Sequence, residues 1–107
     1  MTVEQIDQLI AAEAPRGSSK SQVIAFLDSH KIEHSVYLGD PETSSDFRYY
    51  VPDSKKLLIK GYVTAIIRNV HTGRWEVFTR RSLQMHFYFD ERGNLVEYTL
   101  KEIGTKS

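Results

Sequence analysis

Apolar residues in the first third of the chain recur at the three- and four-residue spacing of helices that pack on one side. This pattern predicts one helix over about 3–14 and a second over about 19–31. Thr2 and Ser19 are each followed three residues later by glutamine, the spacing of a capping box at a helix start. A Pro-Arg-Gly sequence at 15–17 ends the first helix. Because each helix has only about three turns, both need a surface to pack on.

The remaining residues alternate between apolar and polar side chains or form β-favouring runs, which is typical of strands. Strands are predicted over about 34–38, 57–70, 74–90 and 94–103. Apolar residues on both faces of the second strand predict a central position for it. The third strand is so long that we expect a bend or bulge near Arg80 and Arg81. The turn Asp90-Glu91-Arg92-Gly93-Asn94 predicts a hairpin between the last two strands.

Two helices followed by strands predict an α+β fold, with both helices on one face of an antiparallel β-meander of about four strands. The whole chain, 1–107, is expected to form one domain. The helix and strand periodicities indicate one shared core, with the parity of the final strand open by one residue. The residues expected in that core are Val23, Phe26, Leu27, Ile67, Met85, Phe87, Phe89, Val96 and Leu100.

Composition narrows the classes of function. Lysine plus arginine and aspartate plus glutamate both number 14, so the formal net charge is zero, which argues against nucleic-acid binding through bulk charge. The absence of cysteine excludes disulfides, thiolate metal ligands and a cysteine nucleophile among these residues. No apolar run approaches the ~20 residues that span a bilayer, and no signal-peptide pattern is visible. The compartment stays open between the cytoplasm and, if a signal or anchor has been removed, the periplasm.

Two segments resemble the BamE (SmpA/OmlA) family of small bacterial outer-membrane lipoproteins. They are the glycine–serine helix start at 17–27 and the hairpin at 87–95. The segments 65–70, 87–90 and 98–102 also look like a group of small uncharacterised bacterial proteins. The resemblance implies two helices against a three- or four-stranded antiparallel sheet, as in BamE-like and β-lactamase-inhibitor-like domains. It also implies a protein-binding scaffold without catalysis.

Histidine offers the main candidate chemistry. The sequence from His30 to His34 matches H-x-x-E-H, in which two histidines one helical turn apart bind zinc. We expect no metal site here, because the helix ends near Lys31 and the two histidines then lie on different elements. His86 is expected to point away from the core face, as part of either a functional surface or a partly buried structural position. No serine stands in a G-x-S-x-G elbow and no glycine loop cradles phosphate, so neither an enzyme nor a cofactor is predicted.

The candidate binding residues form a basic–aromatic surface, since arginine and tryptophan are enriched in binding hot spots. They are Arg68, Trp75, Phe78, Arg80 and Arg81. The leading hypothesis is a non-enzymatic protein-binding or assembly module that uses the helix-free sheet face or an edge strand to bind a protein partner or to form a homodimer. These residues could instead cap the core and keep the sheet soluble.

The alternative function is a small protein that binds an apolar ligand in a pocket between the helices and the sheet. The residues expected to line that pocket are Phe26, Tyr37, Tyr49, Tyr50 and Phe87. Cavity volume distinguishes the two hypotheses, because a tightly packed core of large side chains leaves no room for a ligand.

Overall fold

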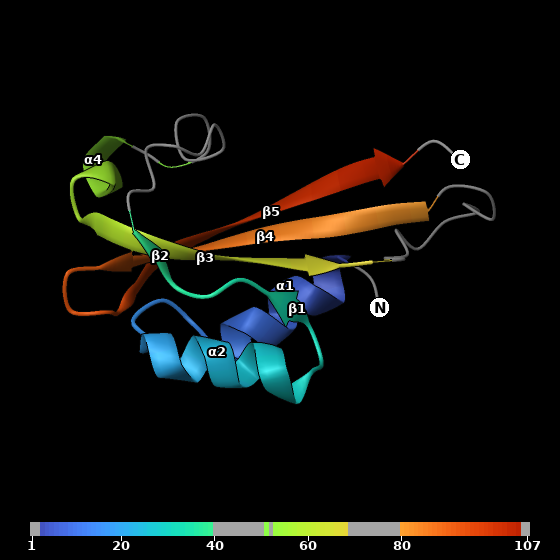
Figure 1. Cartoon of the computed structure of the whole chain (residues 1–107), viewed down its shortest axis with the longest axis horizontal. Helices are drawn as coiled ribbons and strands as arrows, with labels where there is room; N and C mark the ends of the chain where they lie inside the picture. The colour runs from blue at the N-terminus through green and yellow to red at the C-terminus, as the bar shows by residue number, and fades with distance from the viewer. Residues whose placement is uncertain (1–2, 40–50, 52, 69–79, 106–107) are drawn as a thin grey trace.

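Two helices cover one face of an antiparallel sheet in the computed structural model, which describes residues 3–39, 51, 53–68 and 80–105 (Figure 1). Helix α1 spans Val3–Glu13 and α2 spans Lys20–Ser29. The Ser19 side chain caps α2 by accepting a 3.1 Å hydrogen bond from the amide of Gln22, as the capping-box spacing predicts. The helix-start signal read from the sequence is therefore confirmed for α2.

The sheet is built on three long strands, β3 (Ile59–Ile67), β4 (Arg80–Asp90) and β5 (Leu95–Thr105). Two short strands, β1 (Glu33–His34) and β2 (Leu38–Gly39), both pair with β3, so the order is β1-β3-β4-β5 with β2 also beside β3. All pairs are antiparallel. A four-residue helix, α4 (Asp53–Lys56), precedes β3 and lies away from α1 and α2 (Figure 1). The predicted α+β class is confirmed, with five strands in place of about four.

The strand predicted over 34–38 is interrupted, giving β1 and β2 as separate segments. At Ser35 a side-chain hydrogen bond takes the place of a main-chain bond to β3. The Ser35 amide donates to the Thr64 carbonyl at 2.8 Å, and the Thr64 amide donates to the Ser35 hydroxyl at 3.1 Å. Val36 is consequently 76% exposed. Of the strand predicted over 74–90, residues 74–79 lie outside the described residues.

The main core lies between the helices and the sheet, and six of the nine predicted core residues are buried in it. They are Val23, Phe26, Leu27, Met85, Phe87 and Phe89. Ile67 and Leu100 are half-buried against the same core. Burial of these side chains holds the two short helices on the sheet, since neither helix is stable alone.

Val96 was assigned to the wrong face. The β4–β5 register shifts between Tyr88 and Phe89, so Leu95 pairs with Phe89 whereas Glu97 pairs with Tyr88. This bulge inserts one extra residue and moves Val96 to the opposite face of the sheet. There Val96 packs against a second cluster formed by Val51, Ile59 and Tyr88.

His86 lies on this second face, as the alternation of β4 predicts, and it is only 3% exposed. Its ring stacks on Tyr88 with centroids 6.0 Å apart and lies 6.3 Å from Tyr62. The helix-free face was expected to be open, but around His86 and Tyr88 it is buried. Among the described residues, no helix is long and apolar enough to cross a membrane.

Candidate interaction edge

The structure places three of the predicted binding residues at one end of the sheet. Arg80 and Arg81 begin β4, where they pair with Thr105 and Gly104 at the end of β5. Arg68 directly follows β3, whose last residue pairs with Leu83 only a few positions along β4. The other two predicted residues, Trp75 and Phe78, lie outside the described part of the chain. The backbone therefore places three arginines at the end of the sheet where β5 ends, with Arg80 and Arg81 beside β5 and Arg68 two strands away from it.

Arg68 is held weakly at this end. Its Nη2 lies 3.5 Å from Glu33 Oε2, and both side chains are about two-thirds exposed. An exposed pair at this distance contributes about 0–1 kcal/mol, because solvent screens the attraction and ordering two long side chains costs entropy. Arg68 therefore remains accessible to an acidic group of a partner.

The end of β5 belongs to a sheet edge. Among the described strands β5 pairs only with β4, and Figure 1 shows it along the outer side of the sheet. An edge strand exposes main-chain N–H and C=O groups that can pair with another chain. Natural proteins often cover such edges or place charges on them.

The first part of the β5 edge is covered by the turn between α1 and α2. The Leu95 carbonyl accepts a 2.8 Å hydrogen bond from the Gly17 amide, and the Leu95 amide donates to the Ser18 carbonyl at 2.7 Å. Three residues further on, the Tyr98 amide donates to Oε1 of Glu97 at 3.0 Å. Residues 95–98, which we call the covered half of β5, are thus closed to another strand.

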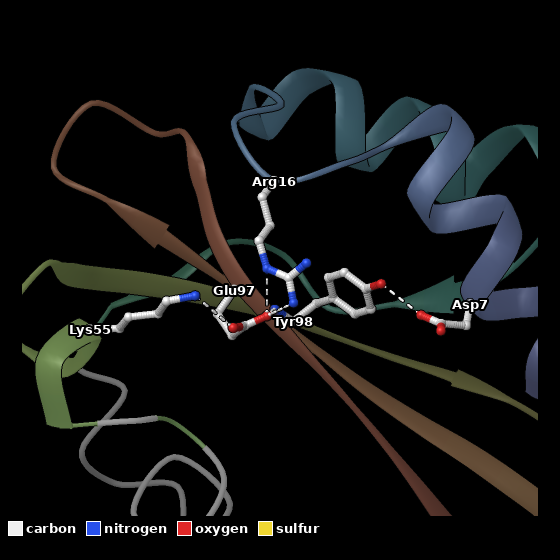
Figure 2. Close-up of polar contacts among 5 residues, drawn as sticks. All are labelled: Asp7, Arg16, Lys55, Glu97 and Tyr98. Atoms are coloured by element: carbon white, nitrogen blue, oxygen red, sulfur yellow. Dashed lines mark hydrogen bonds and ion pairs between the residues drawn. The ribbon is translucent and has the colours of Figure 1, made fainter.

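Glu97 is held in this position by two cations that come from different parts of the chain (Figure 2). Arg16, in the α1–α2 turn, donates from Nε and Nη2 to Oε1, with the Nε contact at 2.9 Å. Lys55, in α4, donates from Nζ to Oε2 at 2.8 Å. Burial raises the pKa of Glu97, but the hydrogen bonds from Lys55, Arg16 and the Tyr98 amide outweigh this effect and leave that pKa lowered. The carboxylate stays ionised at neutral pH.

Tyr98 ties α1 to the same strand. Its hydroxyl donates to Asp7 Oδ1 at 2.6 Å, and the Arg16 guanidinium lies 5.1 Å from its ring centroid (Figure 2). Burial, followed by the bond to Asp7, raises the pKa of Tyr98 to about 12. We call Asp7, Arg16, Lys55, Glu97 and Tyr98 the Glu97 cluster. Its hydrogen bonds connect α1, the α1–α2 turn and α4 to the covered half of β5.

Residues 99–105, the open half of β5, have no such cover among the described residues. Because the Tyr98 amide faces away from β4, the alternation of an antiparallel ladder directs the main-chain groups of Leu100 and Glu102 to the same outer edge. Thr99 and Lys101 direct theirs toward His86 and Gln84 of β4. The open half therefore directs the main-chain groups of alternate residues to the outer edge of the sheet.

The two histidines of the H-x-x-E-H motif lie on different elements, as expected. His30 follows α2 and its Nε2 lies 3.1 Å from Glu13 Oε2, whereas His34 belongs to β1. His34 Nδ1 donates to the Ser35 carbonyl at 2.8 Å, and its Nε2 lies 2.7 Å from Asp28 Oδ1. These two bonds, the one to Ser35 first, outweigh burial and raise the pKa of His34. Within the described ranges, no three histidine, aspartate or glutamate side chains gather as metal ligands.

The pockets described in the structure open at the rim of the sheet and its turns. One of about 310 Å³ lies where β1 meets β3, lined by Glu33, His34, Ser35, Thr64, Ala65, Ile66 and Gln84. Phe26 and Phe87, expected to line an apolar ligand pocket, are instead buried within the main core. Tyr37 lies over Gly61, where its ring occupies the space of a Cβ, and Lys20 Nζ is 4.1 Å from the ring centroid. Tyr49 and Tyr50 lie outside the described residues.

Comparisons with known protein families, curated proteins and solved structures found no match to this chain. The arrangement of the β5 edge itself is therefore the basis for proposing a function.

Proposed function

We propose that the protein is a non-enzymatic binding module that adds an extended segment of a partner protein, as a further antiparallel strand, to the open half of β5. The observation that supports this proposal is the division of the β5 edge. Residues 95–98 are covered by the α1–α2 turn and by Glu97, whereas no such cover lies over residues 99–105 among the described residues, and Leu100 directs its main-chain groups to the outer edge there. A strand that adds to a sheet gains affinity from main-chain hydrogen bonds and specificity from alternate side chains.

The regular pairing of β5 with β4 favours such binding. The β4–β5 register continues without interruption from Tyr98 to Thr105, and the Glu97 cluster fixes the preceding residues. Because the edge is already in the bound conformation, little conformational entropy is lost on its side when a partner strand pairs. The half-buried Leu100 and Ile103 supply apolar contacts beside the main-chain bonds.

The arginines at the end of the sheet indicate the kind of segment that would bind. Arg80 and Arg81 adjoin the last residues of β5, and Arg68 lies at the same end of the sheet. They are three of the five residues of the basic–aromatic surface predicted from the sequence, and their positive charge favours a partner segment that carries acidic residues. The resemblance to BamE-like bacterial domains, which implies a protein-binding scaffold, agrees with this role.

The test uses the immobilised protein to select peptides from a displayed library of extended ten-residue sequences. Selected peptides are then measured against Glu102→Pro, which removes one outward N–H, and against the matched control Glu102→Ala, which keeps it. We expect proline to weaken binding at least tenfold and alanine less than threefold. Proline is tolerated where an edge N–H is not used by the neighbouring strand, so both variants should fold.

Amide hydrogen exchange gives an independent measurement. The Leu100 amide should exchange fast in the free protein and become protected when a peptide binds, while the Thr99 and Lys101 amides are protected throughout. Protection that appears elsewhere, equal binding to the proline and alanine variants, or a library that yields no binder would each refute the proposal.

A further inference from the structure

We infer that a pocket between the end of α2, β1 and the end of β3 binds a small amphiphilic carboxylate, and that the Lys31 ammonium pairs with the carboxylate. The pocket has a volume of about 250 Å³. Figure 1 shows the chain passing from the end of α2 into β1, which pairs with β3. Among the described strands, β1 and β5 lie at opposite ends of the strand order. The inference therefore goes beyond strand addition at β5 and does not depend on it.

Three isoleucines give the pocket its apolar lining. Ile32 lies between α2 and β1, and Ile66 and Ile67 end β3. All three are half-buried, so part of each remains exposed. A ligand with an apolar group would gain free energy by covering that exposed surface. Sites for small molecules have this composition, in which a mostly apolar lining carries a few polar groups that fix the orientation of the ligand.

Lys31, which also lines the pocket, has an unusual backbone conformation. Its φ is 56°, in the left-handed region, and no other non-glycine residue in the described part of the chain has a positive φ. It closes the end of α2, because its amide donates to the Asp28 carbonyl at 3.1 Å. The next amide, that of Ile32, donates to the Leu27 carbonyl at 2.9 Å. Glycine is the usual residue at this position of a helix end, because a Cβ is strained there.

The side chain of Lys31 makes no contact that would explain this strain. It is exposed and forms no hydrogen bond or ion pair with any residue that the structure describes. Residues held in sparsely populated backbone regions cluster at functional sites, where the side chain has a use that outweighs the strain. At this position a lysine offers a ligand an ammonium group, which glycine could not supply.

The charges around the pocket favour an anion. Its described lining residues include two permanent cations, Lys31 and Arg68, and a single carboxylate, Glu33, so the lining is net positive. Arg68 lies 3.5 Å from Glu33, and this pair stays in place when the ligand binds. The His30 ring keeps its 3.1 Å contact with Glu13 and takes no part. Because Lys31 supplies the charge that pairs with the ligand, no existing contact has to break.

The volume of the pocket limits the size of the ligand. At roughly 30 Å³ for each non-hydrogen atom, the volume that a water molecule occupies in the liquid, the pocket holds about eight such atoms. A carboxylate joined to a short apolar chain has this size and matches both kinds of lining. Two sources offer this chemistry, namely a free short-chain acid and the C-terminal residue of a peptide that ends in an apolar side chain.

The test measures binding of hexanoate, which is of this size, by NMR titration of the isotope-labelled protein. We expect saturable shifts of the Lys31, Ile32 and Ile67 amide signals, with a Kd of about 1 mM for so small a ligand. The neutral analogue hexanamide should bind at least threefold more weakly, because it cannot pair with the ammonium. Equal binding of hexanamide, equal shifts caused by inorganic phosphate, or shifts that do not saturate would each overturn the inference.

Variants of Lys31 separate a ligand contact from a structural role. Lys31→Gly removes both the strain and the ammonium, so it should raise Tm and yet weaken hexanoate binding at least threefold. The matched control Lys31→Arg keeps the charge and should bind hexanoate within twofold of wild type. Unchanged hexanoate binding by Lys31→Gly would overturn the contact with the ligand. A lower Tm of Lys31→Gly would show that the lysine stabilises the end of α2 through the helix dipole, and would overturn the argument from strain.

A tripeptide that ends in a leucine with a free carboxylate distinguishes the two sources of the ligand. Binding at least threefold tighter than that of hexanoate, and lost when the C-terminus is amidated, assigns a peptide C-terminus to the pocket. Equal or weaker binding assigns a free acid, and tight binding that survives amidation overturns the pairing with Lys31. Hexanoate should leave the hydrogen exchange of the Leu100 amide unchanged, so the failure of this inference is distinguishable from the failure of strand addition at β5.

Discussion

Replacing Glu97 by glutamine tests whether the Glu97 cluster stabilises the edge of the sheet. The substitution Glu97→Gln keeps the size and shape of the side chain but removes its negative charge. The amide oxygen of the glutamine can still accept a hydrogen bond from Arg16. Lys55 loses its ionic partner, because the amide nitrogen that would face its ammonium group is itself a hydrogen-bond donor. The Glu97 side chain is only 12% exposed, so the mismatch is poorly relieved by water.

The magnitude follows from the exposure of the two cations. A hydrogen bond to a charged group contributes about 1.5–3 kcal/mol when well shielded. The Arg16 side chain is 54% exposed and the Lys55 side chain is 35% exposed. Solvent therefore screens both contacts, and each contributes less free energy than that range. We expect a loss of about 2 kcal/mol in the free energy of unfolding. At ~4 °C per kcal/mol for a domain of this size, Tm should fall by about 8 °C.

The assay is urea unfolding of wild type and Glu97→Gln at pH 7 and pH 3. Because the folded pKa of Glu97 is lowered from 4.5, its stabilisation is present above the unfolded pKa and is lost as pH falls through the folded pKa. The difference between the two proteins should therefore shrink at pH 3. Glu91→Gln removes the same charge from an exposed position in the β4–β5 turn and should change stability by less than ~0.5 kcal/mol. A difference for Glu97→Gln below ~0.5 kcal/mol at pH 7, or one that is equal at both pH values, would refute the stabilising role.

Two further predictions concern the core and His34. Phe87→Ala should lower the free energy of unfolding by about 3–5 kcal/mol, because this side chain is fully buried. The control Val36→Ala, at an exposed position, should lower it by less than ~0.5 kcal/mol. Equal Tm values for the two variants would contradict the core assignment. Asp28→Asn should lower the pKa of His34, measured by NMR titration of the ring. The raised folded pKa of His34 means that its stabilisation is fully present below pH 6.5 and is lost as pH rises through the folded pKa, so the stability difference between Asp28→Asn and wild type should be largest in acid. An unchanged titration would show that the contact has no effect.

Local signals were sufficient for the helix start and the last hairpin. Ser19 caps α2 through the residue three positions later, and Asp90 Oδ1 accepts from the amides of Arg92 and Asn94 in the turn. Gly93 has a positive φ of 78°, which glycine adopts without strain. In each case the interacting atoms lie within four residues, so the sequence specifies the contact before any tertiary structure forms.

Pairing between β4 and β5 decided which face of the sheet each β5 side chain occupies, which the alternation of apolar residues had left open. Alternation on β5 allowed two parities, and the bulge opposite Tyr88 placed Leu95, Tyr98 and Leu100 toward the helices but Val96 on the other face. A bulge is a property of two strands together and leaves little trace in the sequence of one of them. The same holds for Ser35, whose side chain bonds to a strand 29 residues away in the chain.

The sequence by itself determined the two capped helices, the hairpin and most of the core, because these depend on periodicity and short-range hydrogen bonds. It also indicated arginines that the structure gathers at one end of the sheet. Only the tertiary structure decided that β5 is an edge strand and that Glu97 receives Arg16 and Lys55, which stand 81 and 42 residues away from it. An acidic residue in a half-polar strand has no local feature that reveals its partners. Distant charges meet only after helices and strands have packed in one register, so the division of the edge into a covered and an open half is a property of the folded chain.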